Sequence, residues 1–296
     1  MKYNKYVEQV QMDLVVAGYS VGKHGIDGKF GKDTLSAVNE AIADALECDD
    51  DPDDDYPFIK GLKYGALGEG VENLQKLLEK WNMKYYLGAG YIDGIFGKGT
   101  KEAVMEFQKA MSKKPDGKVD EELWKLLKID PIDISFWTTP QVSKIEGDNG
   151  KLPLACNCNG KYCDSAGNAV PGKTSVGLMI LLVRIENELN ARFKRDDIKV
   201  RLTDDMNLND HDDANGGNRC KEWNAQHGGA KKSQHIVCKA ADIYFVCPDV
   251  KGKERPTMHD MWMVADDLNP YGGVGEYKSN IHVDTRGNKA RWSKGV

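Results

Sequence analysis

Residues 233–245 read SQHIVCKAADIYF, and the second half of this stretch predicts a strand. The run AADIYFVC at 240–247 has the composition and length of a strand. Because alternate side chains of a strand point to opposite faces, one face carries apolar residues that suit a core, namely Ala241, Ile243 and Phe245. Asp242 then points away from that core.

A second predicted strand, NIHVDT at 280–285, repeats this arrangement. His282 and Asp284 project together from the face opposite the apolar residues of the same strand, Ile281 and Val283. His235, on the turn before the first strand, can reach the same point. Two histidines and one carboxylate, with a fourth position left for water, are typical of a catalytic zinc site. The pair of motifs therefore predicts that Zn²⁺ is bound here.

Two further stretches predict helices in the same part of the chain. Residues 176–193 form a long apolar run typical of a largely buried helix. Residues 257–268 suit a helix that begins at Thr257 or Pro256. Together with the strands, they predict an α+β domain over residues 140–296. No HExxH motif occurs, which excludes the common helix-based zinc protease.

The first half of the chain contains an internal repeat, in which residues 7–39 match residues 71–107. Both copies place a glutamine in an apolar-periodic segment and follow it with a turn, IDGKFGK in the first and IDGIFGK in the second. Each copy predicts a helix, the turn, a second helix and a third short helix. We expect Phe96 to fill the small core of the second copy and Thr100 to cap its second helix.

These copies resemble the peptidoglycan-binding domains of bacterial wall hydrolases. The resemblance rests on LKYGALGEGVENLQKLL and YIDGIFGKGTKEAVMEFQ in the second copy, and it is weaker in the first. It implies two small all-α three-helix modules, at residues 1–50 and 57–130, that bind glycan or stem peptide of peptidoglycan beside the turn. We expect the turn residues themselves to form the fold rather than contact ligand: Asp27, Phe30, Asp93 and Phe96.

The second half resembles the zinc D-alanyl-D-alanine carboxypeptidase and endopeptidase family. SQHIVCKAAD matches its S-x-H-x-x-G-x-A-x-D signature, and GGVGEYKSNIHVDTRG matches its closing segment. The resemblance covers residues 140–296 and implies a Hedgehog/DD-peptidase-like fold. It also implies a set of zinc ligands, His235, Asp242 and His282. Arg219, in the upstream loop, matches the arginine that stabilises the carbonyl oxygen or terminal carboxylate of the substrate.

The sequence departs from this family at three places. Cys238 stands where the signature has glycine, which puts the turn geometry in question. Ser279 stands where several relatives carry a catalytic carboxylate, three residues before the last zinc histidine. The general base must then be Asp284 or Glu276, and we favour Asp284 because it is aligned on the strand with His282. Asp284 equally suits a role in orienting a ligand. The loop at 203–218 is long and acidic, and we expect its His211 to lie in a solvated loop rather than to bind metal.

Composition limits the remaining classes of protein. The chain has 296 residues, 40% of them hydrophobic and 29% charged, with a net charge of -5, as in soluble multidomain proteins. No apolar run approaches the roughly 18 residues that a membrane span needs. The N-terminus lacks the apolar core of a signal peptide. No basic patch interleaved with aromatic residues predicts nucleic-acid binding.

Cysteines and a run of acids add two expectations. Seven cysteines, an odd number, favour reduced thiols made in a cytosol. Cys156, Cys158 and Cys163 raise the alternative of a second, structural metal site that could include Cys220, although their spacing is not that of paired CxxC motifs. The acidic stretch ECDDDPDDD at 47–55 predicts a linker.

This domain order predicts a phage-type endolysin that is made in the host cytoplasm and acts at the cell wall. Its substrate would be a stem-peptide amide, either D-Ala-linked or L-Ala–D-Glu. Two alternatives stay open. One is a wall-binding protein whose peptidase fold has lost activity, which the residues at 238 and 279 motivate. The other is a cellular D,D-carboxypeptidase, which should carry a signal peptide or an anchor. The sequence leaves the oligomeric state open.

Overall fold

The computed structural model describes residues 3, 5–29, 31–47, 56–88, 91–138, 154, 156, 174–203 and 216–295. Its contacts divide the chain into two compact units. The first comprises Met1–Lys80, Tyr86–Val104 and Gly117–Ile129, and the second comprises Trp81–Tyr85, Met105–Asp116 and Asp130–Val296. The second unit therefore takes in residues 105–116, which the sequence assigned to the second wall-binding module. The predicted limits of the two modules stay a prediction.

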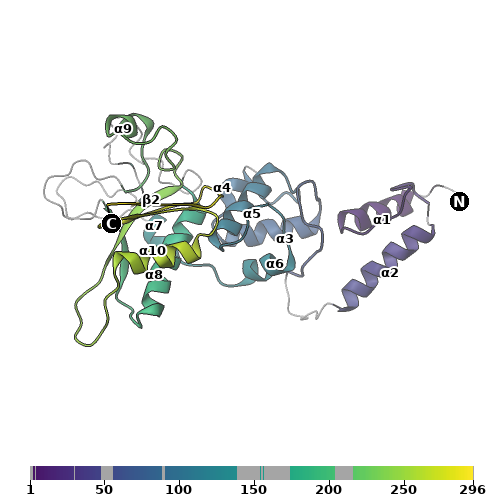
Figure 1. The fold of residues 1–296 in the computed structure, drawn as a ribbon. Helices are drawn as coiled ribbons and strands as arrows, with labels where there is room; N and C mark the ends of the chain where they lie inside the picture. Colours follow the sequence, from purple (N-terminus) through teal and green to yellow (C-terminus); the bar gives the residue numbers. More distant parts are fainter. Residues whose placement is uncertain are drawn as a thin grey trace. The chain divides into compact units, whose positions relative to one another are not determined.

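The first unit is helical, as the repeat predicts (Figure 1). Its helices are α1 (Lys5–Val16), α2 (Lys32–Glu47), α3 (Glu69–Lys80) and α6 (Glu121–Lys128). Two more helices, α4 (Lys84–Leu87) and α5 (Lys98–Ala110), have residues in both units. The third short helix expected in the second copy is α6, which Asp120 caps by accepting a hydrogen bond from the backbone N–H of Leu123.

A buried glutamine organises each copy of the repeat. In the second copy, Gln75 donates to the carboxylate of Asp93 at 2.8 Å and accepts from the backbone N–H groups of Asp93 and Gly94, both at 3.0 Å. In the first copy, Gln11 makes the same contacts with Asp27 and Gly28. Each glutamine thus ties the first helix to the turn, because a buried amide needs both its donor and its acceptor satisfied.

The turn residues of the second copy form the fold, as expected. Hydrogen bonds from the side chain of Gln75 and the backbone of Ile95 lower the pKa of Asp93 and hold it as an acceptor. Phe96 is fully buried. The prediction for Thr100 was wrong, because α5 begins two residues earlier, at Lys98. The Thr100 hydroxyl instead accepts a hydrogen bond from Gln75 and donates one to the carbonyl of Ile95.

The second unit contains a five-stranded sheet in the order β1-β2-β4-β3-β5. Its strands are β1 (Lys199–Leu202), β2 (Ala240–Val246), β3 (Gly273–Tyr277), β4 (Ile281–Asp284) and β5 (Ala290–Lys294). The β3 and β5 strands run parallel, and the other neighbours run antiparallel. The two predicted strands are confirmed as β2 and β4. The sequence analysis missed the other three.

Helices cover one face of this sheet. They are α8 (Val176–Arg192) and α10 (Met258–Leu268), which pack on each other and on the strands. Both were predicted, and Thr257 caps α10 through a capping box with Asp260. The short helix α9 (Lys221–Gln226) lies on the opposite side of the strands, and α7 spans Ser135–Thr138 (Figure 1). The covered face is fully buried at Ala241, Ile243, Ile281 and Val283.

A buried ion pair within the second half of α5 is hydrogen-bonded to the N-cap of α8. Glu106 contacts Lys109 at 2.7 Å, and their side chains are only 5% and 9% exposed. Ser175, the N-cap of α8, donates to the other carboxylate oxygen of Glu106 at 2.6 Å and lies 3.2 Å from the hydroxyl of Thr285. Because these polar groups are buried, their charges depend on one another for compensation.

Several expectations fall outside the described residues. They concern Phe30, residues 48–55 of the acidic stretch, Cys158, Cys163 and His211. Within the described residues, no helix combines the length and apolar character that a membrane span requires.

Replacing Glu106 by alanine should destabilise the second unit. The change strands the ammonium of Lys109 in a buried position, so we expect the free energy of unfolding to fall by about 3 kcal/mol. Glu102→Ala is the matched control, because Glu102 makes an exposed pair with Lys98 on the same helix. We expect a change below about 0.5 kcal/mol there. Urea denaturation measures both, and equal losses would contradict the buried network.

Candidate metal centre

The pairing of β2 with β4 sets Asp242 directly opposite His282. Directly paired residues of an antiparallel ladder project from the same face of a sheet, so both side chains leave the sheet on the side away from α8 and α10. Their neighbours Ala241 and Val283 are also paired and fill the core on the other face. The strand periodicity in the sequence predicted this division of faces.

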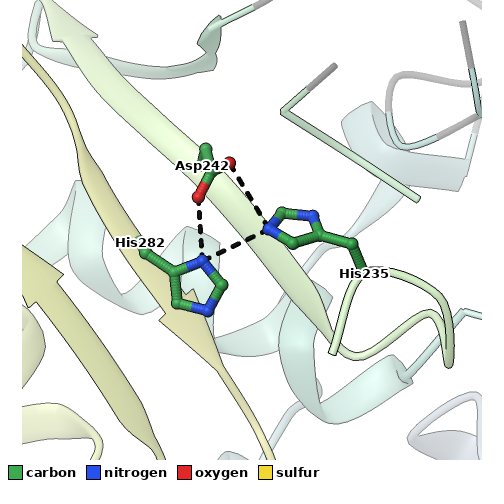
Figure 2. A group of neighbouring side chains, drawn as sticks. All are labelled: His235, Asp242 and His282. Carbon is green, nitrogen blue, oxygen red and sulfur yellow. Dashed lines mark hydrogen bonds and ion pairs between the residues drawn. The ribbon is translucent and has the colours of Figure 1, made fainter. Parts of the chain in front are cut away.

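His235 completes the group from the turn before β2. Its Nε2 lies 3.2 Å from Nδ1 of His282 and 3.4 Å from a carboxylate oxygen of Asp242. The third side of the triangle, from Nδ1 of His282 to Asp242, measures 2.8 Å. Figure 2 shows the three side chains converging on one point. Among the described residues, this is the group of histidine, cysteine and acidic side chains that could hold a metal ion.

A second layer of hydrogen bonds fixes both imidazole rings. Nδ1 of His235 lies 2.6 Å from the carbonyl oxygen of Gly217, and Nε2 of His282 lies 3.0 Å from the carboxylate of Asp284. The opposite ring nitrogens therefore face Asp242. Metal-binding histidines usually hold their second nitrogen in this way. Two nitrogen donors and one oxygen donor suit Zn²⁺ with an open fourth position, so the residues present fit the predicted ion.

The charges of the group depend on burial and on one another. Burial by itself lowers the pKa of His282, but hydrogen bonds to Asp242 and Asp284 outweigh it and raise the pKa to about 9. Burial likewise lowers the pKa of His235, and there it prevails. The two histidines hold the pKa of Asp242 well below its usual value against the effect of burial.

Asp284 lies behind His282, on the side of the ring away from the point of convergence. Its carboxylate is fully buried and also accepts hydrogen bonds from Arg286 and from the backbone N–H of Gly273. Burial opposes the charge, but the hydrogen bonds from His282 and Arg286 hold the pKa of Asp284 far below its usual value. This placement favours the orienting role over that of the general base.

The other proposed base, Glu276, lies on the opposite face of the sheet. It neighbours Gly275, which is paired with His282, so its side chain points toward the helices. There it contacts Nδ1 of His259 on α10 at 2.8 Å. Ser279 is exposed in the turn between β3 and β4. The structure therefore does not bring Glu276 to the group, although strand β3 passes beside it.

Arg219 reaches the group directly. Its guanidinium donates to Asp242 at 2.5 Å and lies 5.7 Å from the ring of Trp223. The backbone N–H of Arg219 donates to the carbonyl of His235 at 3.1 Å, which ties the arginine loop to the turn that carries the histidine. A cationic side chain is thus held beside the carboxylate of the candidate metal site.

Cys238 occupies a left-handed backbone conformation, with φ of 58°. This region suits glycine, because a Cβ crowds the following carbonyl there. The turn closes through hydrogen bonds from Cys238 N–H to His235 and from Ser175 N–H to Cys238. The substitution at the glycine position of the signature therefore keeps the turn, with the conformation that glycine would adopt.

Two groups that contact the histidines of the site were not predicted from the sequence. The first is the carbonyl of Gly217, which no side-chain pattern reveals. The second is Trp292 on β5, whose ring lies 5.1 Å from that of His282. The tryptophan crosses β3 at Gly275, where a Cβ would lie 2.3 Å from its ring. A glycine within a strand often marks the close approach of another group, but the strand that carries Gly275 was not predicted from the sequence.

Two family models match parts of the chain. Residues 68–127 match the model of a peptidoglycan binding domain, and residues 212–284 match the model of Peptidase M15. The first match covers the second copy of the repeat and leaves residues 1–50 outside it. The second match contains the whole His–Asp–His group. No curated protein matches the chain.

Replacing Asp284 by asparagine should weaken metal binding without removing a ligand. The loss of the charged acceptor leaves His282 less basic and less firmly held, so we expect zinc affinity to fall about 10- to 100-fold. Glu276→Gln is the control, because it alters the carboxylate on the opposite face. Chelator competition measures both affinities. A loss of peptide cleavage in Glu276→Gln at unchanged zinc affinity would restore Glu276 as the base.

Replacing Cys238 by glycine should preserve the fold. Relief of the left-handed strain, about 1–2 kcal/mol, offsets the lost thiol contacts and the greater freedom of the unfolded chain. We expect the free energy of unfolding to stay within about 1 kcal/mol of the wild type. Cys238→Val should lose more than this, because a β-branched residue is disfavoured at positive φ. Thermal denaturation compares the two variants, and equal stability would refute the assigned strain.

Proposed function

We propose that this protein is a zinc-dependent peptidase that hydrolyses peptide bonds of bacterial peptidoglycan. The observation that carries the proposal is the convergence of His235, Asp242 and His282 within the stretch that matches Peptidase M15. The match of residues 68–127 to a peptidoglycan binding domain supports the wall as the substrate. A binding module in the same chain raises the local concentration of wall peptides around the peptidase.

Each residue of the site has its own role in this proposal. Zn²⁺, when bound, polarises a water molecule and lowers its pKa toward neutrality. Asp242 and the two histidines hold the ion, and Asp284 acts as a positioning residue by fixing the ring of His282. Arg219 stabilises negative charge that develops on the attacked carbonyl oxygen, since its guanidinium lies beside the carboxylate of the ligand set.

The finer assignments extend this proposal. The α+β unit has a Hedgehog/DD-peptidase-like fold, and residues 1–50 form a second wall-binding module. The identical glutamine networks of Gln11 and Gln75 support that second module. The protein acts as a phage-type endolysin on a D-Ala-linked or L-Ala–D-Glu amide.

Chelation should abolish peptide release from purified peptidoglycan. We expect the zinc-loaded protein to free one defined pair of amino and carboxyl ends, identified by mass spectrometry. Removal of zinc, or the substitution His282→Ala, should stop that release because the ligand set is broken. Zinc added back should restore the wild type and not the variant. Release that persists in excess chelator would overturn the proposal.

A wall-binding protein without activity is the second candidate. The observation that favours it is the position of the two acidic residues considered as base. Asp284 lies behind His282, and Glu276 lies on the far face of the sheet. Under this alternative, the protein binds zinc and sediments with peptidoglycan but frees no new termini. The same mass-spectrometric assay separates the two functions.

A further inference from the structure

A row of residues crosses the face of the sheet that carries the candidate metal centre. Asp242 on β2 is paired with His282 on β4, which is paired in turn with Gly275 on β3. Gly275 is aligned with Trp292 on β5. Because aligned residues of neighbouring strands leave a sheet on the same side, Trp292 starts from the face that holds the metal ligands. Gly275 has no side chain, so the row has a gap between His282 and Trp292.

The indole of Trp292 fills this gap. It lies over Gly275, where a Cβ would come within 2.3 Å of two atoms of the indole. The centroids of the indole and the His282 imidazole are 5.1 Å apart, and the ring planes are inclined by 48°. This distance is typical of aromatic pairs that attract each other. The indole therefore contacts the imidazole, and the glycine at 275 leaves the room for it.

Two further contacts hold the indole in place. Its N–H donates to the hydroxyl of Tyr277 at 3.0 Å, and Tyr277 leaves β3 on the same face as Gly275. The guanidinium of Arg286 lies 5.5 Å from the indole centroid, at the distance of a cation–π contact. Arg286 also donates to Asp284, the carboxylate behind His282. The indole and the hydrogen-bonded layer behind the ligands thus support each other.

The hydrogen bond between Asp284 and Nε2 leaves one motion of His282 weakly restrained. Nε2 lies close to the axis of the Cβ–Cγ bond, because that axis passes through the far side of the five-membered ring. Rotation about this bond therefore moves Nε2 little, whereas it carries Nδ1 around the axis. The torsion has broad minima in histidine and does not fix the ring plane by itself. Nδ1 is the nitrogen that faces Asp242, at 2.8 Å, so its direction depends on this rotation.

We propose that Trp292 is a positioning residue that fixes the plane of the His282 imidazole and so keeps Nδ1 directed at the metal ion. Rotation of the imidazole would drive its edge into the indole, which Tyr277 holds in place. Asp284 fixes Nε2, and Trp292 fixes the rotation about the Cβ–Cγ bond. The inference rests on the proposed function, because it takes a metal ion as the ligand of His282.

Replacement of Trp292 by leucine or by phenylalanine tests the role of a flat ring. Both side chains are apolar and smaller than tryptophan, but only phenylalanine offers a plane to the imidazole. Chelator competition on the full chain measures zinc affinity. We expect this affinity to fall about tenfold in Trp292→Leu and less than about threefold in Trp292→Phe. Ser293→Ala, an exposed change on the same strand, is the control and should keep the wild-type affinity.

Cobalt provides a spectroscopic signature of the same effect. The visible absorption bands of Co²⁺ depend on how its ligands are arranged, so they report the direction of Nδ1 without any peptide. The bands of the Co²⁺-loaded protein should change in Trp292→Leu and stay close to those of the wild type in Trp292→Phe. Melting temperatures show whether each variant is folded.

Gly275→Ala reaches the same contact from the opposite side. Its added Cβ displaces the indole, so the variant should lose about as much zinc affinity as Trp292→Leu does. The two losses should not add in the double variant, because the contact that each removes is the same. Losses that add would show that the two residues act separately and would overturn the inference.

The remaining outcomes separate this inference from the proposed function. Equal zinc affinities of folded Trp292→Leu and Trp292→Phe overturn the positioning role. If the leucine variant does not fold, unchanged zinc affinity in folded Gly275→Ala overturns it instead. Peptide release from peptidoglycan by the wild type is followed separately by mass spectrometry. The expected affinities without release support the role of Trp292 and overturn the peptidase activity, whereas release with equal affinities does the reverse.

Discussion

The register between β2 and β4 determines whether this protein has a metal site. Asp242 faces His282 across the ladder, and both leave the sheet on the face that the helices do not cover. A slip of one residue would turn the carboxylate toward the core and bring Ala241 to the site. The apolar residues that alternate with the ligands prevent this slip, because they must stay buried against α8 and α10.

The second constraint is the buried layer behind the ligands. His282 is held through Asp284 and Arg286, and His235 is held through the carbonyl of Gly217. These contacts determine which ring nitrogen of each histidine faces Asp242. They thereby determine the direction from which an ion can be bound. They also engage the carboxylate of Asp284 in hydrogen bonds behind His282, a placement that favours an orienting role over that of a general base. The hydrogen bonds that hold the two histidines in place therefore also decide which carboxylates face the candidate metal site.

The helical repeat is likewise held together by buried hydrogen bonds. One buried glutamine in each copy satisfies the backbone of the Asp-Gly turn, so a short chain with little apolar core still fixes its loop. Helix α5 contributes residues to both units. Its second half carries Glu106, whose ion pair and contact with Ser175 belong to the unit that holds the sheet. The boundary drawn from sequence similarity therefore differs from the one drawn from contacts.

The sequence by itself determined the elements whose pattern is local. Strand periodicity separated Asp242 and His282 from the core, Thr257 or Pro256 marked the start of α10, and repetition marked the two helical copies. Tertiary structure alone decided what depends on partners distant in the chain. It placed Glu276 on the helix-covered face, set Asp284 behind His282, and brought Gly217 and Trp292 around the site. Local patterns give the direction of a side chain relative to its own strand, whereas its neighbours are set by which strands pair and in what order.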